Sequence, residues 1–158
     1  YSSPDPIGVE VGGAVKNVIA IACGIATGLG YGDNARAALM TRGLAETTRF
    51  AVALGARRDT LLGLAGMGDM VLTCSSQQSR NFSFGFALGQ GKSAAEILAE
   101  RRAVTEGVTT AQAVLRRASS LNIDMPICAF VHAIVQDGAD VRHELNRLLS
   151  RPLRPESE

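Results

Sequence analysis

Apolar side chains recur every three or four positions along nearly the whole chain, the spacing of one face of an α-helix. We find no convincing run with the period of two that is typical of a β-strand. The first and longest helix is expected to run from Pro6 to about Gly28. A second helix is expected to begin with a cap at Asp33 or Asn34 and to close at Gly55.

The same periodicity predicts shorter helices along the rest of the chain. Asp59 opens a short apolar segment, a Gly-rich junction follows, and Ser79 and Ser93 are candidate caps for the next two helices. Three more amphipathic helices are expected at 106–121, 126–138 and 140–151, with Pro126 in a first helical turn. The pattern therefore predicts an all-α domain over residues 7–150, preceded by a linker at 1–6 and followed by a disordered tail at 151–158.

The composition is that of a globular protein of one domain. Of 158 residues, 46% are apolar and 4% aromatic, and the net charge is +1, so we expect no nucleic-acid partner. The three cysteines are far apart and lack His partners at ligand spacing, so neither a disulfide framework nor a metal site is indicated. We expect a cytoplasmic protein. The linker-like opening YSSPDP suggests the second domain of a longer chain.

Two glycine-rich stretches resemble phosphate-binding motifs only superficially. In GLGYGD the third glycine of a dinucleotide fingerprint would fall on Asp33, and in GFALGQGKS a required glycine is Phe86. Both stretches also follow expected helices rather than strands. The apolar run at 11–32 is long enough to raise the question of a membrane span. It is interrupted by Lys16, Asn17 and several glycines, so a helix buried in protein is expected instead.

Lys16 is the only charged residue of that apolar run. Helical spacing places it on one face with small residues, which are Gly12, Gly13, Ala20 and Cys23. A stripe of small residues lets another helix or a ligand approach the backbone closely. Partial loss of solvent favours the neutral form of a lysine, which can then transfer protons near neutral pH. The alternative is a lysine whose stem merely covers apolar surface.

Two further polar features could accompany Lys16. Asp69, in the junction GMGDM, could pair with the lysine or could cap the helix that follows it. Ser79, Arg80 and Asn81 stand at an expected helix start. Free backbone N–H groups, a hydroxyl, a guanidinium and an amide there suit an anion such as phosphate, although a simple cap with a solvated arginine explains them equally well.

These blocks resemble a known family. GGAVKNVIAIACGIATGLGYGDNARAALMTRGLAE, GLAGMGDMVLTCSSQQSRNFSFG and TEGVTTAQAV are similar to the C-terminal domain of bacterial NAD(P)-dependent glycerol-3-phosphate dehydrogenases, over about residues 3–149. The resemblance implies a substrate domain of the 6-phosphogluconate-dehydrogenase C-terminal-like type. It implies interconversion of sn-glycerol 3-phosphate and dihydroxyacetone phosphate with NAD or NADP, for phospholipid precursor synthesis. It also implies a homodimer, and a partner Rossmann domain that this chain does not contain.

By resemblance, Lys16 is the general acid/base at the C2 oxygen. Substrate would be bound by Lys16, Asp69, Ser79, Arg80 and Asn81, and cofactor would be contacted by Arg80, Val104 and Glu106. Asn17 and Thr73 match family positions near the site. Without the Rossmann domain the chain is expected to be inactive or nearly so, because nothing orients the nicotinamide.

Two other functions stay open from the sequence. One is the substrate domain of a related β-hydroxyacid-type dehydrogenase, although relatives of that kind often separate the lysine and the asparagine that are adjacent here, as Lys16 and Asn17. The other is a catalytically silent helical interaction module. The joint presence of Lys16, Asp69 and the Arg80–Asn81 pair argues against it.

Overall fold

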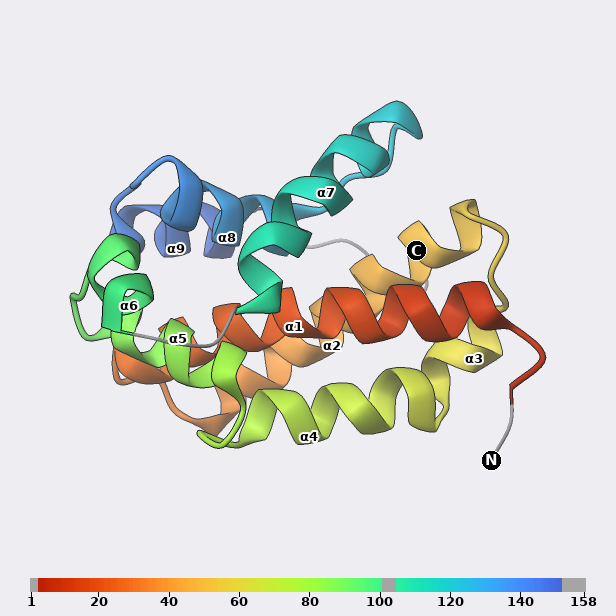
Figure 1. The fold of residues 1–158 in the computed structure, drawn as a ribbon, viewed down its shortest axis with the longest axis horizontal. Coiled ribbons are helices and arrows are strands. Elements are labelled where there is room, and N and C mark those ends of the chain that lie inside the picture. Colours follow the sequence, from red (N-terminus) through yellow and green to blue (C-terminus); the bar gives the residue numbers. More distant parts are fainter. Residues whose placement is uncertain (1–2, 101–104, 152–158) are drawn as a thin grey trace.

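A long helix, α1, passes through the centre of the domain, and the other helices pack around it (Figure 1). The computed structural model describes residues 3–100 and 105–151, and these residues form helices, turns and connecting segments without strands. The prediction of an all-α fold is therefore confirmed. The helical elements are α1 (Pro6–Gly28), α2 (Asp33–Ala53), α3 (Arg58–Leu62), the π-helical turn η1 (Leu64–Gly68), α4 (Asp69–Ser75), α5 (Arg80–Gly89), α6 (Ala94–Glu100), α7 (Glu106–Ser120), α8 (Pro126–Gln136) and α9 (Val141–Leu149).

The apolar stretch of α1 is the core of the protein. Its side chains from Val18 to Ala26 are buried under α2, α4, α5, α7 and α8. By length and composition alone this helix could cross a membrane, but 67% of its most apolar window is buried inside the domain. Burial on all sides explains why the helix is apolar around its whole circumference rather than on one stripe.

Glycines let α5 lie directly on the backbone of α1. A Cβ at Gly24 would stand 2.1 Å from the carbonyl oxygen of Phe82, and one at Gly85 would stand 2.0 Å from that of Ile21. One turn further along, the same contacts are repeated by Gly28 with Phe86 and by Gly89 with Ile25. No larger residue fits such distances. The two helices therefore run parallel in a fixed register, which determines where the start of α5 lies relative to α1.

A buried carboxylate attaches α8 to α2. The N-cap position of α8 is Met125, whose side chain makes no cap hydrogen bond. Instead, the Glu46 carboxylate on α2 accepts the backbone N–H groups of Ile127 at 2.9 Å and Cys128 at 3.0 Å. Burial raises the pKa of Glu46 to about 7, against the lowering effect of those two hydrogen bonds.

Most predicted helix ends are confirmed. The Ser79 hydroxyl accepts the Phe82 N–H at 3.3 Å at the start of α5. Ser93 and Glu96 cap α6 reciprocally, with each side chain accepting the other's backbone N–H. Pro126 begins α8.

One local prediction is wrong. Helix α2 starts at Asp33 with Gly32 in the N-cap position, so neither Asp33 nor Asn34 is the cap; an extended glycine serves without a side-chain bond. The Gly-rich junction before Asp69 forms the π-helical turn η1, a geometry that the sequence did not specify. At its centre, a Cβ on Gly66 would stand 2.0 Å from the Leu61 carbonyl oxygen, so the turn closes only around a glycine.

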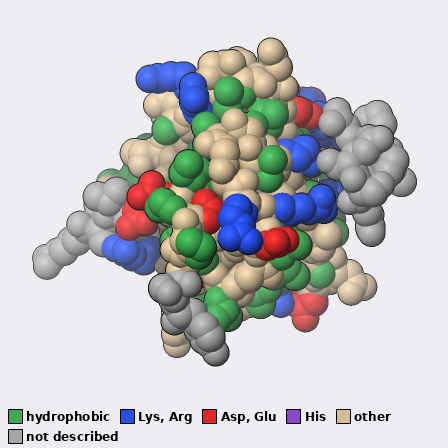
Figure 2. All heavy atoms as spheres, turned by 90° about the vertical axis from the view of Figure 1, so that its right-hand side faces the viewer, with side chains coloured by type: hydrophobic (Ala, Val, Ile, Leu, Met, Phe, Trp, Pro, Cys, Tyr) green, Lys and Arg blue, Asp and Glu red, His purple; other side chains and the backbone are tan. Residues whose placement is uncertain are grey.

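The surface combines balanced charge with exposed apolar side chains. On the face that holds the start of α1 and α3, positive and negative side chains are interspersed with hydrophobic ones (Figure 2). The most exposed large apolar residues include Leu62, Leu64 and Leu72, which are 53%, 68% and 71% accessible and lie on α3, η1 and α4. Exposed apolar groups on consecutive elements are typical of a surface that another protein segment covers.

Candidate active site

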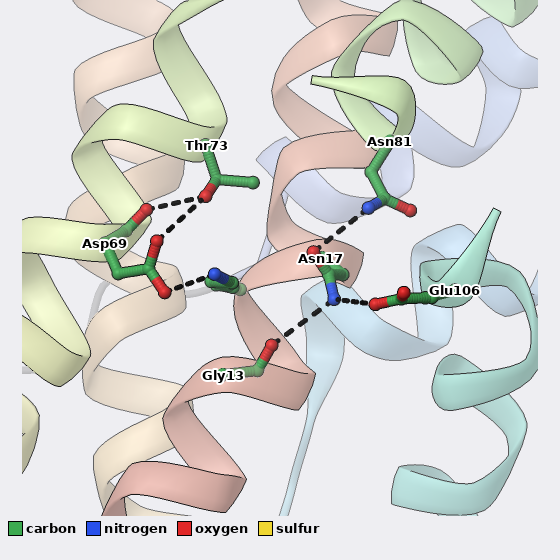
Figure 3. A network of polar contacts seen from close by, with 7 residues as sticks. Gly13, Asn17, Asp69, Thr73, Asn81 and Glu106 are labelled. Atoms are coloured by element: carbon green, nitrogen blue, oxygen red, sulfur yellow. Dashed lines mark hydrogen bonds and ion pairs between the residues drawn. The ribbon is translucent and has the colours of Figure 1, made fainter.

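Lys16 of α1 forms an ion pair with Asp69 at the first position of α4 (Figure 3). The lysine side chain is 20% exposed and the aspartate side chain 36% exposed, so the pair is partly buried but still reaches solvent. Thr73 lies one helical turn beyond Asp69. The Thr73 hydroxyl donates to the backbone oxygen of Asp69 at 2.7 Å and lies 3.4 Å from the carboxylate oxygen Oδ1 of Asp69. The carboxylate is therefore held from two sides.

Gly12, one helical turn before Lys16, explains how Asp69 comes within reach of the lysine. A Cβ at Gly12 would stand 3.1 Å from the carbonyl oxygen of Ala65 in η1, closer than most side-chain contacts allow. The small residue lets the π-helical turn lie against α1. Asp69 follows that turn directly in the sequence, and Lys16 lies one helical turn beyond Gly12 on α1. The contact of η1 with Gly12 therefore places the Asp69 carboxylate beside the lysine. Of the two sequence interpretations of Asp69, the structure supports the ion pair; the N-cap position is Gly68.

Asn17 joins α1 to α5 and α7. Its Nδ2 donates to Glu106 Oε2 at 3.2 Å and to the Gly13 carbonyl at 3.3 Å, and its Oδ1 accepts from Asn81 Nδ2 at 3.0 Å. Asn81 Oδ1 in turn accepts the Gly107 N–H at 2.9 Å. This amide chain brings the first turns of α5 and α7 to the same level of α1 (Figure 3).

Arg80 and Glu106 form the exposed rim of this cluster. The Arg80 guanidinium is 3.9 Å from Glu106 Oε1, and the two side chains are 60% and 62% exposed. Ser79, the cap of α5, precedes Arg80 directly. A hydroxyl, a guanidinium and the start of a ten-residue helix thus meet at one end of α5.

The structure brings the predicted residues together in two adjoining groups. Lys16 and Asp69 form one group; Ser79, Arg80, Asn81 and Glu106 form the other, and Asn17 stands between them. Val104 lies outside the described residues. Within the described part of the chain, no three His, Cys, Asp or Glu side chains converge as metal ligands would.

The resemblance placed Asn17 near the site, but the sequence did not reveal its bonds to both α5 and α7 or the part played by Gly107. A Cβ at Gly107 would stand 2.7 Å from the Asn17 carbonyl oxygen, so this glycine lets α7 start directly against α1. The adjacency of Asn17 to Lys16 was the available signal for the first residue. A single glycine after an expected helix start gave none for the second.

Two buried thiols lie on the helices that carry the ion pair. Cys74 follows Thr73 in α4 and is buried, as is Cys23 on α1. The hydrogen bond with Cys23, and then burial, raise the pKa of the Cys74 thiol far above its ordinary value. The Cys74 thiol therefore stays protonated near neutral pH.

Comparison with known proteins finds relatives that match nearly the whole chain, including the candidate site. The family model described as "NAD-dependent glycerol-3-phosphate dehydrogenase C-terminus" matches residues 5–146. A glycerol-3-phosphate dehydrogenase (NAD(P)+) of Rhodospirillum rubrum is 60% identical over 99% of this chain and 45% of its own length. One from Lactobacillus delbrueckii subsp. bulgaricus is 54% identical over 99% of this chain and 46% of its own length. The chain spans about half the length of these relatives.

Solved structures agree with this result. Glycerol-3-phosphate dehydrogenase of Coxiella burnetii superposes with a TM-score of 0.92 at 45% identity, covering 96% of this chain and 46% of that one. The Saccharomyces cerevisiae enzyme GPD1 gives a TM-score of 0.82 at 30% identity, covering 91% of this chain and 42% of that one. From the family match, the sequence identity and the shared helical fold, the chain belongs to the family of C-terminal domains of NAD-dependent glycerol-3-phosphate dehydrogenases.

Proposed function

We propose that this chain is the substrate-binding and proton-transfer domain of an NAD(P)-dependent glycerol-3-phosphate dehydrogenase, which interconverts sn-glycerol 3-phosphate and dihydroxyacetone phosphate for glycerophospholipid synthesis. The observation that carries the proposal is the half-buried Lys16–Asp69 ion pair beside the Ser79–Arg80 helix start, in a chain of this family. A proton donor and an anion site next to each other match the two ends of a phosphorylated ketone.

In ketone reduction, Lys16 Nζ would hand a proton to the C2 oxygen as that oxygen becomes an alkoxide. Asp69 orients the ammonium group by its ion pair, and Thr73 fixes the aspartate by its hydrogen bonds. In the reverse direction the neutral lysine accepts the hydroxyl proton. A compact ammonium on a flexible stem suits this exchange, because its charge responds to its surroundings.

The phosphate would bind at the start of α5. Arg80 offers a guanidinium, Ser79 a hydroxyl, and the helix N-terminus a partial positive charge. Asn81 is buried and both of its amide atoms already bond to the protein, so its contribution to substrate binding would be to place this helix start.

NAD or NADP supplies the hydride for this reaction when bound. The described residues fit the cofactor only at its edge, because Arg80 and Glu106 face solvent together on the rim. Val104, also expected there, adjoins Thr105 and Glu106 in the sequence. The main cofactor site would belong to a Rossmann domain of the same enzyme, which would cover the exposed apolar residues on α3, η1 and α4. We further propose a homodimer and a cytoplasmic location.

The test is a chimera that joins this chain to the part of the Rhodospirillum rubrum relative outside the matched region. It should oxidise NADH or NADPH with dihydroxyacetone phosphate, and Lys16→Ala should lower kcat by about a hundredfold or more. Lys92→Ala is the matched control, because Lys92 pairs with Glu100 at an exposed site. Turnover of a different hydroxyacid would favour the related dehydrogenases, and a chimera that binds no substrate would favour an interaction module.

A further inference from the structure

Gly13 is a glycine of α1 whose missing side chain has no packing explanation in the described part of the chain. The other glycines of this helix make room for protein. A Cβ at Gly12 would stand 3.1 Å from the Ala65 carbonyl oxygen, and Gly24 and Gly28 lie against the backbone of α5. At Gly13, no atom of residues 3–100 or 105–151 outside its own helix turn comes within 4 Å of the Cβ position. A glycine inside a helix is less favourable than alanine, and here nothing in the domain compensates.

The helix register explains the open space. α5 packs along α1 at Asn17, Ile21 and Ile25, three positions four residues apart. Gly13 is the next position of that stripe toward the start of α1. α5 begins only at Arg80, beside the Asn81 side chain that meets Asn17, so the stripe extends one turn beyond the end of its partner helix. The open side of Gly13 therefore lies just beyond the N-terminal end of α5, on the side toward the start of α1.

The proposed site surrounds this position. Lys16 and Asn17 follow Gly13 by three and four residues and share its side of α1. Asp69 lies on one side and Glu106 on the other, and the Gly13 carbonyl accepts the hydrogen bond of Asn17 (Figure 3). The open space is thus bounded by the proton donor, by the rim of the cluster and by the start of α5.

We propose that Gly13 is a specificity-determining residue, over which the phosphorylated three-carbon substrate passes between Lys16 and the start of α5. The proposal rests on the proposed function, because that function places the reacting oxygen at Lys16 and the phosphate at Ser79–Arg80. The open side of Gly13 offers such a substrate a path across α1 between the two groups. A methyl group there would occupy the space that the substrate needs.

Gly13→Ala therefore has opposite effects on the fold and on the reaction. In the chimera, KM for dihydroxyacetone phosphate rises about tenfold or more, because the substrate is displaced from the helix, while KM for NADH stays within about twofold. In the 158-residue chain, the urea midpoint of unfolding rises, because alanine favours the helix and the space is open. Gly13→Ser, with a larger side chain, raises the same KM further.

A second Gly→Ala change separates this effect from a general disturbance. A Cβ at Gly43 on α2 would stand 2.8 Å from Ile19 Cγ2, away from the proposed site. Gly43→Ala is expected to lower the urea midpoint and to leave KM for dihydroxyacetone phosphate within about twofold. Gly13→Ala therefore changes KM for the substrate without loss of stability, whereas Gly43→Ala lowers stability without a change in that KM.

Direct binding distinguishes this proposal from the proposed function. An inactive parent chimera would count against the proposed function. NMR titration of the 158-residue chain with sn-glycerol 3-phosphate still tests the role of Gly13 in that case. Chemical-shift changes at Lys16 and Arg80 report binding, and an affinity about tenfold weaker in Gly13→Ala supports the role of Gly13. The proposal is overturned by an unchanged substrate KM, by a rise in KM for NADH of the same size, by a lower urea midpoint in Gly13→Ala, or by a parent chain that does not bind the substrate.

Discussion

Asn81 on α5 donates a hydrogen bond to Asn17 on α1, and the glycine contacts between these two helices follow the same register. The two residues are 64 positions apart in the chain, as are Gly85 and Ile21 one turn further along. The polar contact and the glycine contact therefore belong to one interface. A change that separates the helix backbones should also displace the start of α5, where substrate phosphate is proposed to bind.

Gly85→Ala tests whether the two helices pack in this register. The new methyl would stand 2.0 Å from the Ile21 carbonyl oxygen, and backbone cannot move aside cheaply. We expect a loss of about 1–3 kcal/mol in the free energy of unfolding, the usual result of overpacking a core. Urea denaturation of the 158-residue chain measures it, and a variant as stable as the parent would show that the two helices are not held in this register.

Asp69→Asn tests the ion pair. The substitution keeps the shape of the side chain but leaves the half-buried ammonium of Lys16 without its charged partner. In the chimera, kcat should fall about tenfold to a hundredfold, because the lysine loses orientation. Glu100→Gln, at the exposed Lys92–Glu100 pair, is the control and should be neutral. If both variants retain the parent rate, Asp69 has no part in placing the proposed proton donor.

Local signals in the sequence predicted the helices better than their junctions. The apolar period and the cap chemistry of Ser79 and Ser93 act within a few residues, so they can be read from the chain itself. The π-helical turn depends on the contact of Gly66 with Leu61, and its position against α1 depends on Gly12. Such contacts have no signal in a single sequence beyond the glycine itself.

The candidate site follows the same division. Lys16 and Asp69 could be named as possible partners in advance, because an isolated lysine in an apolar helix needs a carboxylate, although the sequence left a helix cap equally open for Asp69. The bonds from Asn17 to Asn81 and Glu106 could not be predicted from local pattern, because they span 64 and 89 residues and depend on where α5 and α7 begin. Distant polar contacts follow from packing register rather than from residue type.

Stability should fall as the pH rises from about 4.5 to about 7, because Glu46 keeps its proton in the folded protein. Burial raises the pKa of this carboxyl from 4.5 to about 7, so the native state binds more protons than the unfolded state in that window. The pKa of Asp5 is lowered by the hydrogen bond from the Gly8 N–H, and its effect belongs to pH below about 4. Urea unfolding at several pH values measures the slope.

Glu46→Gln removes that titration and should flatten the slope between pH 5 and pH 7. It should also reduce stability, because an amide offers only one acceptor to the two N–H groups of Ile127 and Cys128. Glu10→Gln, at an exposed carboxylate on α1, should keep the parental slope. An unchanged slope in Glu46→Gln would mean that other groups control the pH dependence.

The cysteines should be unreactive until the protein unfolds. Cys23, Cys74 and Cys128 are free and buried, and the thiolate is the reactive form of cysteine. The contact with Cys23 followed by burial raises the pKa of Cys74, and burial raises that of Cys128, so neither thiolate forms near neutral pH. A disulfide reagent such as 5,5′-dithiobis(2-nitrobenzoate) should label no thiol rapidly in the native chain and all three in urea. Rapid labelling of Cys74 in the native protein would show that α4 opens away from α1, and the ion pair of Lys16 with Asp69 would then be intermittent as well.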